Sequence, residues 1–287
     1  MKLPFGIKTF GCMAILGTLL AAGCFKKDDV SSDTDSVVNS SVDDAEADVL
    51  YNDVYNDVSG VDSTISITQT DVGAPDLGAS PPGTTFCYTK TISPAGFSFP
   101  KTVTLDFGSG CLGRDGKFRK GKIITVFSDW LRKPGATAVT TFSGYSVNAV
   151  TVEGKQTITN TSTATTRAYT RVVENGKLSK VNGNYIIWSA NYTHTQTAGV
   201  ATPFYYWDDE FTITGSASGQ SSRNGNLIAW TRTITSPLHR KATCRWRDAG
   251  TIAITHNSHA ATLDFGAGNC DNKATITYNG ITKEITL

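Results

Sequence analysis

The chain has 287 residues, 39% of them hydrophobic, and a formal net charge of +1. That near-neutral value conceals two regions of opposite charge: residues 28–89 carry 13 acidic residues and no Lys or Arg, whereas the chain from Lys90 onward carries 22 basic and 12 acidic residues. Neither a Gly-x-Ser-x-Gly nor a His-Glu-x-x-His motif occurs, and nothing in the sequence marks a nucleophile. A Ser-His-Asp site needs only three scattered residues, so the missing motifs do not exclude one.

The first 24 residues have the composition of a lipoprotein signal peptide. Lys2 and Lys8 give a positive start, an apolar run follows over residues 10–20, and small residues precede Cys24. The run is too short to span a membrane comfortably. We therefore predict that residues 1–23 are a signal peptide and that Cys24 carries the lipid that anchors the mature chain.

Residues 24–83 are predicted to form a lipidated acidic tether. Asp43 and Asp44 precede apolar residues at helical spacing up to Val58, which predicts a short, marginal helix in an otherwise disordered arm. Two arrangements remain open: the arm folds back onto the basic domain, or it extends as a solvated spacer because its like charges repel. We favour the spacer, which would end in the Gly- and Pro-rich stretch 73–83.

Residues 84–287 are predicted to form one all-β domain. Val, Thr, Ile and aromatic residues alternate with polar ones, and Asn-Gly pairs at 175–176, 182–183, 224–225 and 279–280 predict two-residue hairpin turns. The first turn would pair Glu174 with Lys177, and the last would pair Tyr278 with Ile281, giving one apolar and one threonine-rich face. We expect an antiparallel meander of about ten strands that forms a sandwich, a barrel or a partly open barrel.

A repeated Leu-Asp-Phe-Gly sequence, at residues 105–108 and 263–266, predicts the disulfides. Each copy is followed by a cysteine, Cys111 or Cys270, and preceded by another, Cys87 or Cys244. An antiparallel register around each hairpin brings the two cysteines of one copy close together. We therefore predict Cys87–Cys111 and Cys244–Cys270, with pairing across the copies as the alternative. The Leu and Phe of each copy should face the core, with the Asp pointing outward or capping the turn.

One cluster combines aromatic rings with carboxylates. As a functional site it could stack a sugar ring and bind its hydroxyls, or supply an acid/base pair. The alternative, which we favour, is the start of a strand with alternate aromatics buried. The residues are Tyr205, Tyr206, Trp207, Asp208, Asp209 and Glu210.

Other candidate chemistry is sparse. His256 and His259 offer two metal ligands without a third, so we expect no metal site, and no motif indicates a cofactor. The basic run over residues 114–122 is explained by a solvated loop and edge-strand lysines, or by an anionic headgroup or polysaccharide. We expect no nucleic-acid partner.

Three features together resemble one group of proteins. They are the Lys26-Lys27-Asp28-Asp29 tag after Cys24, the repeated Leu-Asp-Phe-Gly-x-Gly loops with their cysteines, and the closing residues 279–287. They resemble uncharacterised, surface-exposed lipoproteins of the Bacteroidota. The resemblance implies a lipid anchor in the outer membrane and a domain on the cell surface, but no activity.

We therefore expect a non-catalytic surface lipoprotein with a binding or structural role. Its partners would be the membrane, through the lipid anchor, and a glycan or another surface protein. The alternative is a carbohydrate-active or other hydrolase that uses the acidic residues near Trp207.

Overall fold

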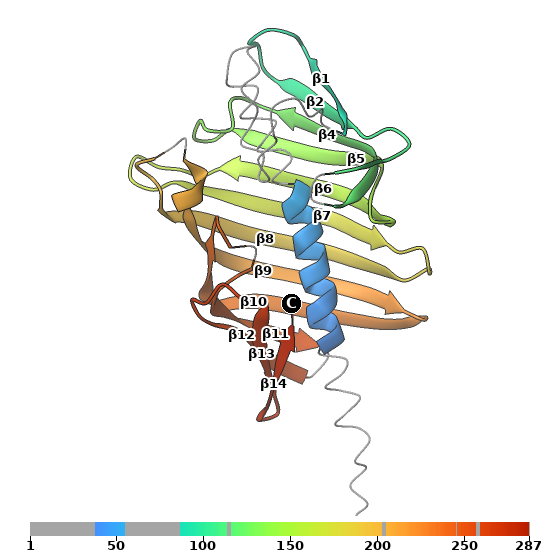
Figure 1. Cartoon of the computed structure of the whole chain (residues 1–287), viewed down its shortest axis with the longest axis vertical. Coiled ribbons are helices and arrows are strands. Elements are labelled where there is room, and N and C mark those ends of the chain that lie inside the picture. Colours follow the sequence, from blue (N-terminus) through green and yellow to red (C-terminus); the bar gives the residue numbers. More distant parts are fainter. Residues whose placement is uncertain are drawn as a thin grey trace, which may run out of the picture.

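The computed structural model describes residues 38–54, 87–113, 116–202, 205–244, 246–256 and 259–286. The predictions for the signal peptide, for Cys24 and for residues 25–37 and 55–83 lie outside these ranges. The described residues form one helix over residues 38–54, one short 3-10 turn and fourteen strands (Figure 1). No helix within them is long and apolar enough to cross a membrane.

The strands follow the chain in a meander. Each pairs with the next in antiparallel fashion, except that β4 pairs with both β2 and β3. In chain order they are β1 (Thr89–Ser93), β2 (Lys101–Asp106), β3 (Cys111–Leu112), β4 (Phe118–Phe127), β5 (Thr137–Val147), β6 (Val150–Asn160), β7 (Ala168–Ser179), β8 (Tyr185–Ala198), β9 (Glu210–Arg223), β10 (Asn226–Lys241), β11 (Ala249–His256), β12 (His259–Ala267), β13 (Lys273–Tyr278) and β14 (Ile281–Thr286).

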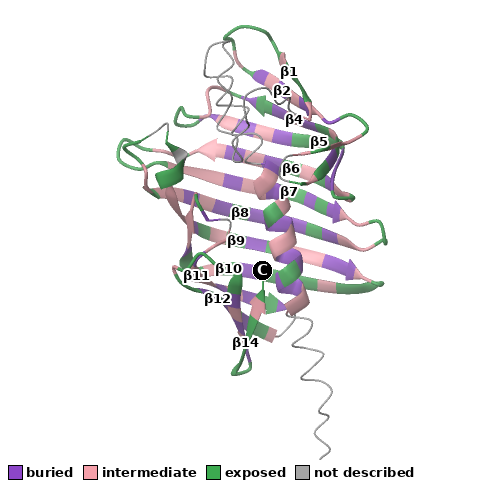
Figure 2. Cartoon of the chain, viewed as in Figure 1, coloured by how far each residue is buried: buried purple, intermediate pink, exposed green. Residues whose placement is uncertain are grey.

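The predicted all-β antiparallel meander is confirmed. It has fourteen strands rather than about ten, and they make a single sheet that is not closed. Buried and exposed residues alternate along the strands, so one face of the sheet is packed and the other meets water (Figure 2).

Two of the four Asn-Gly pairs make the predicted two-residue hairpin turns, at 224–225 and 279–280. The pair at 182–183 lies in a longer connection, because the last ladder pair before it joins Ser179 to Tyr185. The turn at 279–280 has the predicted register, with Tyr278 opposite Ile281. The prediction at residues 175–176 is wrong, because β7 continues through this pair as a bulge: Glu174 lies opposite Lys155, and Lys177 lies opposite Glu153. Asn175 has φ 52°, a conformation that serves a bulge as well as a turn.

The helix lies across the packed face of the sheet, roughly perpendicular to the strands (Figure 1). Its buried residues Ala47, Tyr51 and Val54 belong to the same hydrophobic cluster as the inward residues of the strands. Of the two arrangements left open by the sequence, the arm therefore folds back over residues 38–54. The expectation of a solvated spacer is wrong for this segment.

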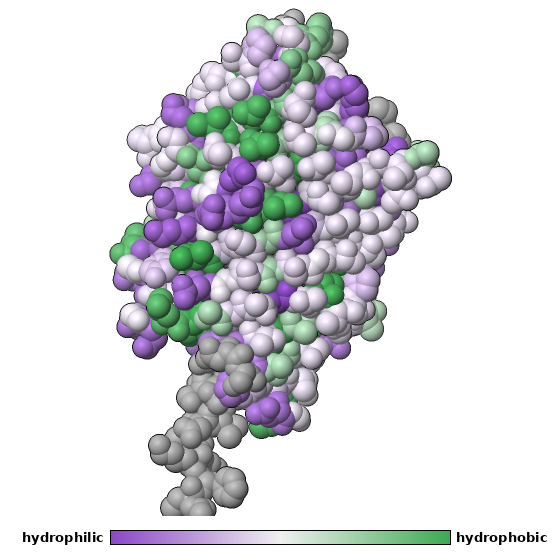
Figure 3. All heavy atoms as spheres, turned by 180° about the vertical axis from the view of Figure 1, so that it is seen from behind, coloured by the Kyte–Doolittle hydropathy of each residue, from purple (hydrophilic) through white to green (hydrophobic). Residues whose placement is uncertain are grey.

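The opposite face of the sheet is rich in threonine. One row runs from β5 to β9 through successive cross-strand partners: Thr137, Thr159, Thr170, Thr193 and Thr214. Figure 3 shows this face with broad areas of intermediate hydropathy between smaller apolar and charged patches. The threonine-rich side predicted from the last hairpin therefore extends over much of the sheet.

The two Leu-Asp-Phe-Gly copies have the predicted structure. Phe107 and Phe265 are buried. The two aspartates cap their turns: Asp106 Oδ1 accepts a hydrogen bond from the Gly108 amide at 2.9 Å, and Asp264 Oδ1 accepts the equivalent bond in the second copy. The disulfides are the two predicted pairs, Cys87–Cys111 and Cys244–Cys270, with Cα atoms 5.6 and 5.7 Å apart.

Candidate functional site

The acidic side of the helix is inserted into a cluster of arginines on the sheet. Asp48 pairs with Arg171 of β7 and with Arg247, which precedes β11, while Asp44 pairs with Arg232 of β10. Both carboxylates, Arg171 and Arg232 are at most 4% exposed. Residues four apart lie on the same face of a helix, so Asp44 and Asp48 turn to the sheet together.

Aromatic rings pack between these ion pairs. Tyr51 of the helix stacks on Trp188 of β8, with ring centroids 5.5 Å apart. The indole Nε1 of Trp188 donates a hydrogen bond to Asp44 Oδ1 at 2.9 Å. The helix is therefore held by apolar stacking and by hydrogen-bonded charges at once.

The ring of Tyr192 lies beneath two of the guanidinium groups. The Cζ atoms of Arg171 and Arg232 are 5.4 and 5.6 Å from its centroid. Burial raises the pKa of the Tyr192 phenol, so the ring stays neutral and presents an electron-rich face to both cations.

The electrostatics of the cluster follow from burial and from the guanidinium groups. Burial alone raises the pKa of the Asp48 carboxyl, but Arg247, Arg171 and Arg232 outweigh it and hold that pKa well below its usual range. Burial, together with the charge of Arg171, holds the pKa of His194 well below its usual value. Asp48 is thus ionised and His194 is neutral at physiological pH.

Further ion pairs fix the two ends of the helix. Their basic partners are partly exposed, and the pairs spread the attraction along the helix. The pairs are Asp43–Arg223 and Glu46–Lys180 in the N-terminal half and Asp53–Lys117 near the C-terminal end.

The predicted ligand-binding cluster, residues 205–210, lies in the connection between β8 and β9. Residues Tyr206–Asp208 form the 3-10 turn η1, and β9 begins only at Glu210. Tyr205 is 57% exposed and Trp207 is 48% exposed. The favoured interpretation as the start of a strand is therefore wrong for residues 205–209, and the rings of Tyr205 and Trp207 lie on the surface of a loop.

The carboxylates of this loop have different surroundings. Asp208 Oδ2 accepts a hydrogen bond from the Thr202 hydroxyl at 2.6 Å, and Asp209 Oδ1 accepts one from Gln196 Nε2 at 2.7 Å. Burial and the neighbouring Asp208 raise the pKa of Asp209 to about 6. Asp209 would therefore exchange a proton near neutral pH.

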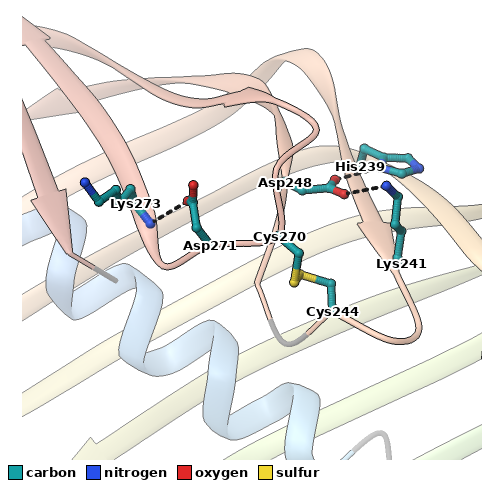
Figure 4. Close-up of a disulfide and its surroundings, with 7 residues drawn as sticks. All are labelled: His239, Lys241, Cys244, Asp248, Cys270, Asp271 and Lys273. Carbon is teal, nitrogen blue, oxygen red and sulfur yellow. Dashed lines mark hydrogen bonds and ion pairs between the residues drawn. A yellow bond between two sulfur atoms is a disulfide. The ribbon is translucent and has the colours of Figure 1, made fainter.

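Glu210 belongs to a separate cluster. His239 of β10 lies between Glu210 and the buried Asp248, with N–O distances of 3.2 Å to Glu210 and 2.6 Å to Asp248. Figure 4 shows Asp248, His239 and Lys241 beside the Cys244–Cys270 disulfide. Although the six predicted residues are contiguous in the chain, the Glu210 side chain contacts His239 on the neighbouring strand. It is therefore not part of one cluster with Asp208 and Asp209.

The two candidate metal-binding histidines have separate partners. His256 Nδ1 is 2.7 Å from the carbonyl oxygen of Ala229, and His259 Nδ1 is 2.5 Å from the Tyr278 hydroxyl. In the described ranges, no three His, Cys, Asp or Glu side chains group as potential metal ligands.

Two basic residues of the run 114–122, which was predicted as a solvated loop with edge-strand lysines, contact the helix. Lys117 and Arg119 both face Asp53, and Lys122 pairs with Asp106 at 2.7 Å. Part of this run thus contributes to helix docking, a role that the sequence analysis did not assign to it.

The arginines that receive the helix were not predicted as site residues. Arg171, Arg223, Arg232 and Arg247 are scattered through the strands and form no motif. The signal that could have found them is the charge division itself, because an acidic helix next to a basic domain suggests a docking surface.

Comparisons with family models, with curated proteins and with solved structures found no match to this chain.

Proposed function

We propose that this protein is a non-catalytic lipoprotein, anchored through Cys24 to the bacterial outer membrane and exposed on the cell surface, whose β domain binds a glycan. The signal-peptide composition and the resemblance to surface lipoproteins support the location. The exposed rings of Tyr205 and Trp207 beside two carboxylates carry the binding proposal. Aromatic faces stack on apolar sides of ligands, and loops on a rigid scaffold are common places for binding.

The loop joins two long strands that are extensively paired. β8 and β9 are each fourteen residues long and pair along most of their length. Gln196 of β8 holds Asp209 by a hydrogen bond of 2.7 Å, which fixes the loop to the end of the sheet. The rings of Tyr205 and Trp207 are thus presented at one end of the strands, as a preorganised surface requires.

Docking of the helix shortens the distance from the anchor to the domain. Thirteen residues separate Cys24 from Val38, the first described residue of the helix. A chain of this length spans at most about 45 Å when fully extended. The lipid anchor therefore holds the domain close to the membrane, rather than at the end of a sixty-residue spacer.

The experiment is a glycan-array measurement on the soluble protein that starts after Cys24. Trp207→Ala should abolish binding, because the stacking face is lost. The matched control is Phe97→Ala, which removes another exposed aromatic ring, 74% exposed, from a different loop. Binding by the Trp207→Ala variant at the level of the unmodified protein, or binding to a surface protein in place of glycans, contradicts the proposal.

A second candidate function has one observation in its favour. The raised pKa of Asp209, about 6, suits a proton donor in a carbohydrate-active or other hydrolase. In that case Asp209→Asn would lose glycan turnover while keeping binding. Glu210→Gln would have the same effect if Glu210 takes part in the reaction. Unchanged glycan after prolonged incubation with the unmodified protein excludes this function.

A further inference from the structure

Four exposed apolar side chains lie at one end of the sheet, where β5 joins β6, β7 joins β8 and β9 joins β10 (at the right of Figure 1). We call this end the turn edge. Val181, in the β7–β8 connection, is 88% exposed, and Leu227, the second residue of β10, is 59% exposed. Leu112 of β3 and Phe118 of β4 are cross-strand partners and are 66% and 46% exposed. Exposed apolar side chains scattered singly are ordinary, but several at one edge suggest a contact surface.

Hydrogen bonds between neighbouring turns hold these side chains in place. Asn184 Oδ1, in the β7–β8 connection, accepts a hydrogen bond from the Asn224 amide of the β9–β10 turn at 3.0 Å. Asn148 Oδ1, in the β5–β6 turn, accepts one from the Phe118 amide at 2.9 Å. The apolar tips are therefore already ordered, and less conformational entropy is lost when they meet a partner.

The helix brings the N-terminal arm to the same edge. Asp43 is paired with Arg223, the last residue of β9, and Glu46 is paired with Lys180 in the β7–β8 connection at 2.6 Å. Val38 precedes Asp43 by five residues, which is about 8 Å along a helix. The thirteen residues after Cys24 therefore reach the domain beside the turn edge, and they keep Val38 within about 45 Å of the anchor.

The opposite end of the strands carries the loop proposed to bind a glycan. β8 and β9 are each fourteen residues long, so about 45 Å separates the turn edge from the connection with Tyr205 and Trp207. A domain that rests on its turn edge therefore presents this loop to the medium, away from the membrane.

We propose that the turn edge rests on the lipid surface of the membrane, with its four apolar tips inserted among the headgroups. The inference rests on the anchorage proposed above, and it gives the domain a second contact with the membrane besides the lipid on Cys24. Apolar side chains gain free energy by leaving water, and binding at a membrane interface scales with the apolar area that is buried. Four partly exposed side chains offer less than the roughly 800 Å² that each partner buries in a stable protein interface, which disfavours a second copy.

The first measurement is hydrogen exchange, read by mass spectrometry, of the chain from Phe25 onward on vesicles of phosphatidylethanolamine and phosphatidylglycerol. An N-terminal His tag bound to nickel-chelating lipid takes the place of the anchor, so the result does not depend on lipidation of Cys24. Compared with the same protein free in solution, the amides of residues 180–184 and 224–227 should exchange at least threefold more slowly. Those of residues 94–100, at the opposite end, should be unchanged. Protection at the opposite end, or at neither end, overturns the proposal.

Variants separate insertion of the apolar tips from mere proximity to the vesicle. Val181→Ser combined with Leu227→Ser should abolish the protection of both turns, because polar tips gain nothing by leaving water. The matched control, Phe97→Ser combined with Val200→Ser, removes side chains that are 74% and 41% exposed from the opposite end and should keep the full protection. All four residues are exposed, so both proteins should fold. Equal loss in the two proteins, or no loss in the first, overturns the proposal.

Two further results distinguish the alternatives. Slower exchange of the same turns at high protein concentration without vesicles would assign the turn edge to a second copy and overturn the membrane contact. Mass spectrometry of the N-terminal peptide tests lipidation of Cys24 by itself. An unlipidated Cys24 contradicts the anchorage, whereas a tethered protein with unprotected turns contradicts the contact at the turn edge.

Discussion

Asp48 is the side chain on which helix docking depends most. It is 2% exposed and faces Arg171, 1% exposed, together with Arg247. Removing one partner of a buried ion pair lowers the stability of the fold strongly, because the remaining charges stay in a medium that solvates them poorly.

Replacing Asp48 with Asn should lower the free energy of unfolding by about 3–5 kcal/mol, since two guanidinium groups then lose their counter-charge. Urea denaturation measures the change. The control is Glu174→Gln, which breaks the surface pair with Lys155 and should cost at most about 1 kcal/mol. Equal effects of the two changes would contradict the docking described here.

His194 should make stability depend on pH. Its pKa in the folded protein lies well below the usual value, whereas in the unfolded chain it is about 6.5. Below pH 6.5 the unfolded chain therefore binds a proton that the folded protein does not, and the free energy of unfolding falls as the pH is lowered through this window.

His194→Phe should remove that part of the pH dependence. The phenyl ring can keep the stack on Tyr169, whose centroid is 4.5 Å from that of His194, but it cannot take up a proton. Below pH 6.5, the unfolding free energy of the variant should depend on pH less steeply than that of the unmodified protein, by up to about 1.4 kcal/mol per pH unit. Parallel curves for the two proteins would show that His194 is not buried as a neutral group.

At the scale of elements, the helix is an integral part of the packed layer. Its buried face contributes Tyr51 to the stack on Trp188, and its opposite face exposes Val49, which is 45% exposed. A helix of this length is marginal by itself in water, so tertiary packing supplies most of its stability.

The two faces should therefore respond differently to truncation. Tyr51→Ala should lower the free energy of unfolding by about 3–5 kcal/mol, because it opens a cavity against Trp188 and Phe142. Val49→Ala, on the outer face, should change it by less than about 0.5 kcal/mol. Chemical denaturation of both variants tests this, and a large effect of Val49→Ala would mean that another surface covers the helix.

The turns show how far local sequence determines an element. Asn279-Gly280 makes a hairpin because both residues readily adopt positive φ, and alternation on either side fixes the register. Asn175-Gly176 has the same local preference, yet it forms a bulge inside β7. The strands on both sides, β6 and β8, continue past it, so long-range pairing decides between the two outcomes.

At the scale of the whole molecule, the disulfides pin regions toward the two ends of the strand order. Cys87–Cys111 lies by β1 to β4, and Cys244–Cys270 lies by β10 to β13. The two closed segments have sequence separations of 24 and 26 residues. By the chain-entropy argument, each bond restricts the unfolded chain to a similar degree.

Replacing either pair with serine should lower the free energy of unfolding by about 3 kcal/mol, and the two losses should add because the sites are far apart in the sheet. Denaturation under non-reducing conditions measures the loss. Peptide mapping without reduction checks the pairing, and a peptide that links Cys87 to Cys244 would contradict the structure.

The candidate site was predictable in part. Residues 205–210 stood out because aromatic and acidic side chains are adjacent there, and the structure places Tyr205 and Trp207 on the surface. The separation of Glu210 from Asp208 and Asp209 was not predictable, because its partner His239 lies 29 residues further along the chain, on the neighbouring strand.

The sequence by itself determined the antiparallel meander, two of the four Asn-Gly hairpin turns and the disulfide partners. Each of these depends on neighbours in the chain: side chains alternate with period two, Asn-Gly adopts positive φ, and each cysteine pair closes a short antiparallel loop. Only the tertiary structure decided that the sheet stays open and that the acidic helix packs on it. Asp48 meets Arg171 and Arg247 across 123 and 199 residues, and strand order, rather than local preference, brings such distant charges together.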